Sequence, residues 1–220
     1  MRIAVVTGGH IEYDFVGKEL ETGLYDTVIA CDSGCRFFLD TGRKFNYAVG
    51  DFDSIDEESY RKLMAEYGDK VTKYPSEKDY TDTEIAIRLA TDLINENGGV
   101  SGDSSITIYG ATGTRIDHVL GNIELLYEPT MQGINIEIAD SHNRVRLIKD
   151  EAVLDKAMGY PYFSIIPFGT EALVSESGSK YELKDKIVTR GITLGISNEI
   201  AADTAVITTS APLILILAKD

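Results

Sequence analysis

The chain has 220 residues, 43% of them hydrophobic, which is enough to bury the core of one large domain or of two small ones. Its net charge of −15 argues against a nucleic-acid or anionic-membrane surface, because both need clustered positive charge. The first residues lack the pattern of a signal peptide and the longest apolar run, residues 213–218, is far too short to cross a membrane, so we expect a cytoplasmic protein.

The first part of the chain alternates strand-like and helix-like segments. Short apolar runs predict strands at residues 3–7, 27–31, 47–49, 71–74 and 106–109. Apolar residues at helical spacing predict helices at 56–67, 81–95 and 116–127, each with an apolar stripe. This alternation indicates an α/β domain with a parallel sheet and helices on its faces.

The spacing of apolar and turn-forming residues changes after Pro129. Residues 134–138 alternate apolar and polar side chains, and turn-forming residues then recur at short spacing. This pattern is typical of a small all-β sandwich or barrel. We therefore predict two domains, residues 1–130 and 131–220.

Acidic side chains follow four of the predicted strands. In an open parallel sheet, ligands bind beyond the carboxyl ends of the strands. The residues that this rule brings to one edge are Asp32, Asp51, Asp53, Asp79, Asp82 and Asp117. Any one of them alone is better explained as a helix cap or turn residue, but their convergence predicts a ligand site.

Asp51 and Asp53 form the most informative pair. Like charges at this spacing raise each other's pKa, and a divalent cation between them removes the penalty. Gly50 lets the backbone approach closely, and Phe52 is expected to point back into the fold. Since Mg²⁺ prefers carboxylate, water and phosphate oxygens, the pair predicts Mg²⁺ that holds a polyphosphate.

Residues 81–84 have the spacing of a capping box, with Thr81 as the cap and Glu84 reaching back to it. The same spacing puts Asp82 in the first helical turn, where the helix dipole favours a carboxylate that is able to bind metal. The structural and the metal-binding interpretations do not exclude each other.

Residues 110–115 form a glycine-bearing loop before a helix, a shape suited to phosphate. The loop is not a Walker A motif, but Arg115 can clamp phosphate oxygens and Lys78 can supply a second cation. Asp117 and His118 fit two interpretations equally well: the two side chains act together as a catalytic base, or they form a buried structural pair. We find no Ser–His–Asp or Cys–His pattern for covalent catalysis, and the parts present favour phosphoryl-type transfer.

Cys31 and Cys35 have no second cysteine pair or histidine cluster near them, so we expect reduced, partly buried thiols rather than a zinc site. His10 and His142 have no evident partner and are expected at the surface.

Five segments resemble the thiamine pyrophosphokinase family in chain order. They are CDSGC at residues 31–35, GDFDSI at 50–55, SEKDYTDTEIAI at 76–87, GATGTRIDHVLGNI at 110–123, and SGSKYEL with GISNE at 177–183 and 195–199. The resemblance covers both predicted domains.

The resemblance implies an α/β ATP-binding catalytic domain followed by a β-sandwich that binds thiamine and forms a homodimer, with thiamine held between subunits. It implies transfer of pyrophosphate from ATP to the thiamine hydroxyl, with Mg²⁺ on Asp51, Asp53 and Asp82 and with Asp32 close by as a fourth catalytic carboxylate. The residues that it assigns to ATP are Lys78, Asp79, Thr81, Arg115, Asp117 and His118. It assigns Ser197 and Asn198 to thiamine. Eukaryotic relatives stack a tryptophan on the substrate, whereas this chain has no tryptophan and the comparable place falls near Leu215.

Other interpretations are a phosphohydrolase, a non-catalytic nucleotide or thiamine sensor, and a partner-binding scaffold. The acidic pair follows the third strand rather than the first and only one histidine follows Asp117, which argues against two known phosphohydrolase patterns. A scaffold leaves the edge of acidic residues unexplained. AMP release that depends on thiamine separates the kinase from the others.

Overall fold

The computed structural model describes residues 1–220. The chain forms two compact units, Met1–Ser141 and His142–Asp220. None of the helices combines the length and the apolar character that a membrane crossing requires.

The first unit is built on a parallel sheet with the strand order β6-β5-β1-β2-β3-β4, in which every neighbouring pair is parallel. Its strands are β1 (Arg2–Val6), β2 (Thr27–Cys31), β3 (Tyr47–Gly50), β4 (Val71–Lys73), β5 (Ser105–Tyr109) and β6 (Asn135–Ala139). The central strands are almost fully buried, as parallel strands covered on both faces are.

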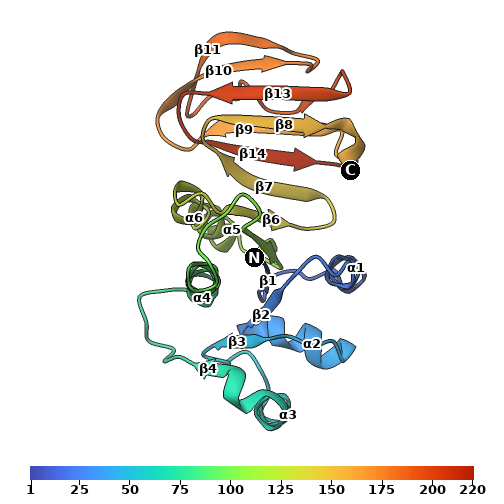
Figure 1. Cartoon of the computed structure of the whole chain (residues 1–220), viewed down its shortest axis with the longest axis vertical. Helices are drawn as coiled ribbons and strands as arrows, with labels where there is room; N and C mark the ends of the chain where they lie inside the picture. The colour runs from blue at the N-terminus through green and yellow to red at the C-terminus, as the bar shows by residue number, and fades with distance from the viewer. The chain divides into compact units, whose positions relative to one another are not determined.

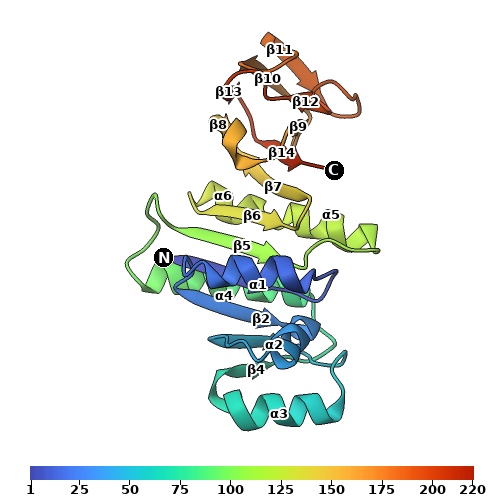
Figure 2. The same cartoon turned by 90° about the vertical axis from the view of Figure 1, so that its right-hand side faces the viewer.

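Helices cover both faces of this sheet. They are α1 (Tyr13–Glu21), α2 (Cys35–Thr41), α3 (Glu57–Tyr67), α4 (Asp82–Glu96), α5 (Ile116–Glu124) and α6 (Tyr127–Met131), with short 3-10 turns η1 (Asp32–Gly34) and η2 (Gly68–Lys70). Figures 1 and 2 show α1, α2 and α3 on one face and α4, α5 and α6 on the other. The layers confirm the predicted α/β/α arrangement.

The chain reverses its direction of winding at β1. From β1 it proceeds outward to β2, β3 and β4, then returns through α4 to β5 on the other side of β1. The loops that leave β1 and β5 therefore lead to helices on opposite faces of the sheet, α1 and α5 (Figures 1 and 2). Such a switch point is where doubly wound folds bind ligands.

The strand β6 pairs in parallel with β5, and the first compact unit ends at Ser141. Two local expectations need correction. The helix expected at 116–127 ends at Glu124, and its apolar stripe is largely exposed, with Ile116 at 71%. Thr81 does cap α4 by accepting a hydrogen bond from the Glu84 amide, but the Glu84 side chain pairs with Arg88 rather than reaching back.

The second unit consists of two antiparallel sheets. One has the order β12-β9-β14-β7 and the other β11-β10-β13-β8. The strands are β7 (Asn143–Ile148), β8 (Glu151–Asp155), β9 (Tyr162–Pro167), β10 (Glu171–Ser177), β11 (Leu183–Thr189), β12 (Asn198–Glu199), β13 (Thr204–Thr209) and β14 (Leu213–Ala218), with a 3-10 turn η3 (Lys156–Met158). Buried side chains of both sheets form one core, including Phe163, Val174 and Leu215, which confirms the all-β sandwich.

Candidate active site

The loops that leave β1 and β5 are joined by backbone hydrogen bonds. The Thr7 amide donates to the Tyr109 carbonyl at 2.9 Å, the Gly9 amide to the Gly110 carbonyl at 2.8 Å, and the His10 amide to the Thr112 carbonyl at 2.7 Å. These bonds continue the pairing of β1 and β5 beyond the strands. Residues 7–10 and 110–114 therefore form one continuous surface, which we call the glycine wall.

Glycine is required in this wall because the two backbones approach so closely. A Cβ atom on Gly9 would lie 2.3 Å from the Gly110 carbonyl oxygen and 2.4 Å from that of Thr112. Gly110 adopts φ +70°, and a Cβ atom there would lie 2.2 Å from the Thr7 carbonyl oxygen. A side chain at either place would force the loops apart.

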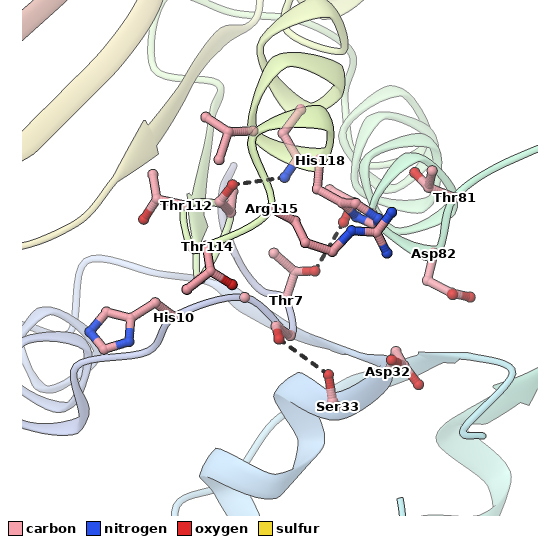
Figure 3. Close-up of a pocket in the computed structure, with 18 of the residues that line it drawn as sticks. Thr7, His10, Asp32, Ser33, Thr81, Asp82, Thr112, Thr114, Arg115 and His118 are labelled. Atoms are coloured by element: carbon pink, nitrogen blue, oxygen red, sulfur yellow. Dashed lines mark hydrogen bonds between the residues drawn. The ribbon is translucent and has the colours of Figure 1, made fainter. Parts of the chain in front are cut away.

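The wall borders a cavity of about 640 Å³ at the carboxyl edge of the sheet. The loops after β1, β2, β3 and β5 line it together with the segment that enters α4 and the start of α5. Figure 3 shows Asp32 and Asp82 facing this space from different elements, with Arg115 at the start of α5. Of the sequence-predicted residues, those that line the cavity are Asp32, Asp51, Lys78, Thr81, Asp82, Arg115 and His118.

Asp32, Asp51 and Asp53 come together at the ends of β2 and β3. Each offers a carboxylate oxygen within 4.8 Å of the other two. The backbone beside this group is strained, since Asp32 has φ +46° and Phe52 has φ +58°, and such strain is common at functional sites. The Phe52 ring is 4% exposed and packs in the core, as predicted, so the acids on either side of it point away from that core.

These three carboxylates fit a hard divalent cation. Oδ1 of Asp32 is buried without a hydrogen-bond partner, while Oδ2 accepts from the Ser54 hydroxyl at 3.0 Å. A buried carboxylate oxygen without a partner costs free energy that coordination to a cation would offset. The metal set that the resemblance implies has Asp82 as its third member. In the structure Asp32 lies with Asp51 and Asp53, and Asp82 lies on the other side of Lys78 from Asp51.

Asp82 is linked to Asp51 through a lysine. The Lys78 ammonium lies 3.1 Å from Oδ2 of Asp51 and 3.0 Å from Oδ1 of Asp82, and only 12% of the Lys78 side chain is exposed. Lys78 therefore acts as an internal counter-ion inside the acidic group. The residues next to Lys78 in sequence do not predict this position, because Lys78 and Asp51 are 27 residues apart in the chain.

The two carboxylates beside Lys78 have pKa values shifted in opposite directions. Desolvation raises the pKa of Asp51, but the Asp53 amide and the Lys78 ammonium outweigh it and lower the net pKa. Desolvation is stronger at Asp82, and it raises the pKa of that carboxyl in spite of Lys78. Asp82 is thus the better proton acceptor of the two, and Asp51 the better permanent anion.

The start of α5 contributes exposed polar groups. The guanidinium of Arg115 pairs with Asp117 at 2.6 Å, and about two thirds of each side chain is exposed. His118 lines the cavity one turn further along α5, whereas Asp117 points to a neighbouring depression. Asp79 is exposed and is not among the residues that line the cavity.

The second unit holds Ser197 and Asn198, which the resemblance assigns to thiamine. Ser197 is exposed and adopts φ +58°. Asn198 is 4% exposed, and its amide group is hydrogen-bonded to the surrounding chain. Leu215 is fully buried in the sandwich core, so it offers no surface to a ligand in place of the tryptophan of eukaryotic relatives.

The residues at 7–10 were missed by the sequence analysis. Thr7, Gly8 and Gly9 line the cavity directly after β1, and His10 is an exposed lining residue. The signal was present, because a Gly-Gly pair at the exit of the first strand of a doubly wound sheet marks a close backbone approach. The two cysteines are free and fully buried, and burial raises the pKa of the Cys31 thiol well above its usual value.

Two family models match the chain, one in each half. Residues 22–138 match the catalytic domain of thiamin pyrophosphokinase, and residues 151–214 match its vitamin B1 binding domain. The thiamine pyrophosphokinase of Bacillus subtilis is 34% identical over 202 residues, which cover 90% of this chain and 89% of that protein. The crystal structure of the Bacillus subtilis enzyme superposes over all of both chains with a TM-score of 0.82 at 32% identity. That of the Geobacillus thermodenitrificans enzyme gives 0.79 at 31%, over 100% of this chain and 98% of that one. The chain therefore belongs to the thiamine pyrophosphokinase family.

Proposed function

We propose that this thiamine diphosphokinase transfers the pyrophosphoryl group of ATP to the hydroxyl of thiamine, with Mg²⁺ held by aspartates at the carboxyl edge of the sheet. The observation that carries the proposal is the pairing of a carboxylate group, Asp32, Asp51 and Asp53, with the glycine wall of the cavity at the switch point. The carboxylate group suits a metal ion, and the glycine wall suits a polyphosphate.

The metal would be held by Asp32, Asp51 and Asp53. A bound Mg²⁺ would neutralise charge on the phosphate oxygens as the reaction proceeds. The buried and unpartnered Oδ1 of Asp32 is the atom that supports this set most directly. Asp82, the third ligand in the family pattern, is paired with Lys78 and serves better as a base.

The phosphates of ATP would lie against the glycine wall. Gly8 and Gly9 leave room for the close approach of the backbone, and a side chain on Gly8 would lie 1.7 Å from the Ser33 hydroxyl. Arg115 would exchange its exposed partner Asp117 for phosphate oxygens, which a guanidinium clamps in pairs. His118 borders the same end of the cavity.

The chemical step needs a proton acceptor beside the thiamine hydroxyl. The hydroxyl oxygen forms a bond to the β-phosphorus, the bond from that phosphorus to the oxygen bridging to the α-phosphorus breaks, and AMP leaves with the electron pair. The hydroxyl proton passes to a carboxylate oxygen of Asp82 or Asp32. Asp82 is favoured because burial raises its pKa.

The second unit would supply the thiamine side. Ser197 and the segment around it resemble the family's substrate motif, and the exposed turn at φ +58° is a strained feature of the kind found at ligand sites. A cytoplasmic homodimer with thiamine held between subunits, as the family resemblance implies, belongs to the same proposal.

The test is incubation with ATP and Mg²⁺, with and without thiamine, scored for AMP and thiamine diphosphate. We expect both products only when thiamine is present. Phosphate release without thiamine would indicate a phosphohydrolase, and binding of both ligands without AMP would indicate a sensor. Either result would overturn the proposal.

A further inference from the structure

The amide group of Asn198 has no hydrogen-bonding capacity left for a ligand. Its Nδ2 donates to Oε2 of Glu176 at 2.7 Å and to the Tyr181 carbonyl at 2.9 Å. Its Oδ1 accepts from the Tyr181 amide at 3.1 Å and from the Glu199 amide at 2.9 Å. An asparagine side chain offers two donors and two acceptor sites, and all four are used. Asn198 therefore acts on the chain around it rather than on a substrate.

Glu176 determines which way the Asn198 amide points. Glu176 lies on β10 and is 4% exposed, and an ionised carboxylate accepts hydrogen bonds but cannot donate them. Its Oε2 therefore requires the NH₂ end of the amide to face it, and the oxygen end must face the backbone amides of Tyr181 and Glu199. Burial of an ionised carboxylate costs free energy of folding, so its presence here indicates a role that offsets this cost.

One asparagine thus fixes two exposed segments. It binds both backbone groups of Tyr181, whose side chain is 63% exposed, and it begins β12 directly after Ser197. The Ser197 amide donates to the Ser164 hydroxyl at 3.0 Å, which holds the strained turn from the other side. The exposed side chains of Tyr181 and Ser197 are both carried by backbone that depends on Asn198.

We propose that Glu176 is a positioning residue for the thiamine subsite, which acts through Asn198 to present the side chains of Tyr181 and Ser197 to the substrate. The inference rests on the proposed function, because it takes thiamine as the ligand of this unit. Thiamine carries a positive charge on a flat aromatic ring, and the face of a tyrosine ring attracts such a cation. Neither Glu176 nor Asn198 touches the substrate.

Four variants test the orientation argument. Glu176→Gln keeps an acceptor for Asn198, whereas Glu176→Met has a similar shape but no acceptor. Asn198→Asp turns a carboxylate toward Glu176, and adding Glu176→Gln to it provides a donor in place of the repelling acid. Ser175→Ala is the control. Ser175 precedes Glu176 on β10, and its hydroxyl is hydrogen-bonded to Asp185 of β11 rather than to Asn198.

We expect Glu176→Met to raise the KM for thiamine about tenfold, because Asn198 would no longer hold the backbone of Tyr181 and Ser197 in place, with the KM for ATP within about twofold. Glu176→Gln and Ser175→Ala should stay within about twofold for both substrates. Asn198→Asp should raise the KM for thiamine at least about tenfold, and the double variant should recover part of that loss. Any of three results would overturn the proposal. They are equal effects of Met and Gln at position 176, a parallel rise in the KM values for thiamine and ATP, and no recovery in the double variant.

Amide hydrogen exchange gives a readout that does not depend on the reaction. The backbone amides of Tyr181 and Glu199 should exchange about tenfold faster in Glu176→Met than in the wild type or in Glu176→Gln. Unchanged protection in Glu176→Met would overturn the positioning role. If the wild type made no thiamine diphosphate while the exchange pattern held, the proposed function would fail and the positioning of Tyr181 by Glu176 would stand.

Discussion

The ammonium of Lys78 lies 3.1 Å from Oδ2 of Asp51, with 12% of the lysine side chain and 11% of the aspartate side chain exposed. The same ammonium also reaches Asp82, so one buried cation serves two acids. Desolvation lowers the pKa of Lys78, but its two carboxylate partners outweigh this effect and raise it. The lysine therefore remains charged and holds the acidic group together in the absence of a ligand.

Replacing Lys78 with Met should lower the free energy of unfolding by roughly 2–3 kcal/mol in metal-free solution, because it leaves two largely shielded carboxylates without their counter-ion. Millimolar Mg²⁺ should recover part of this loss, since a divalent cation can take over the neutralisation. Urea unfolding with EDTA and with Mg²⁺, both without nucleotide, measures the difference. Lys62→Met is the control, since Lys62 pairs with Glu58 on an exposed helix face and should cost no more than about 0.5 kcal/mol. A loss of the same size with and without Mg²⁺ would contradict the counter-ion role.

Replacing Asp82 with Asn should reduce kcat by about 10²-fold or more if this carboxylate accepts the proton of the thiamine hydroxyl. The fold should survive, because the N-cap Thr81 is unchanged and Asn has nearly the same size as Asp. The measurement is AMP formation at saturating ATP, thiamine and Mg²⁺. Asp92→Asn makes the same change at an exposed place on the same helix and should leave kcat unchanged. Turnover near the wild-type value in Asp82→Asn would remove Asp82 as the base.

Replacing Gly9 with Ala should raise the KM for ATP at least about tenfold, because the added methyl group would push the loops after β1 and β5 apart. The KM for thiamine should change less than about twofold. Steady-state kinetics with each substrate varied in turn distinguish the two effects. Gly102→Ala adds the same group where nothing lies within 4 Å, so it serves as the matched control. A larger effect on thiamine than on ATP would contradict the assignment of the wall to the phosphates.

The parallel sheet and the acidic edge were predictable because both follow from local patterns. Each strand reads as an apolar run, and the acids follow the strands directly, so the rule of strand carboxyl ends brings Asp32, Asp51 and Asp53 together without knowledge of distances. The two-unit organisation was visible in the same way, as a change in apolar period after Pro129.

The remaining features depend on contacts between distant segments. The position of Lys78 between two acids requires the segment before α4 to lie over the end of β3, which no local period encodes. The exposure of Ile116 and Leu120 reflects which face of α5 meets the sheet, and a stripe alone does not determine that. The burial of Asn198 was equally hidden, because its partner Glu176 comes from a different strand.

The stability of the second unit should depend on pH through Glu176. Burial raises the pKa of this carboxyl from 4.5 to about 6. Between these values the folded state binds more protons than the unfolded state, so the free energy of unfolding should fall as the pH rises from about 4.5 to 6, by on the order of 1–2 kcal/mol. Glu176→Gln should lack this fall and be more stable than the wild type at pH 7. Calorimetric unfolding at both pH values measures it, and an identical pH dependence of the two proteins would contradict the shifted pKa.

The glycine wall has a consequence for the order of folding. Its two halves, at residues 7–10 and 110–114, are joined only after β5 has paired with β1, and nearly the whole first unit is synthesised between them. An emerging chain can therefore bury most of this core before the cavity at the carboxyl edge of the sheet is complete. ATP that binds in this cavity, as proposed, should slow unfolding more than it speeds refolding. Rate measurements with and without ATP would place the closure of this wall on the folding pathway.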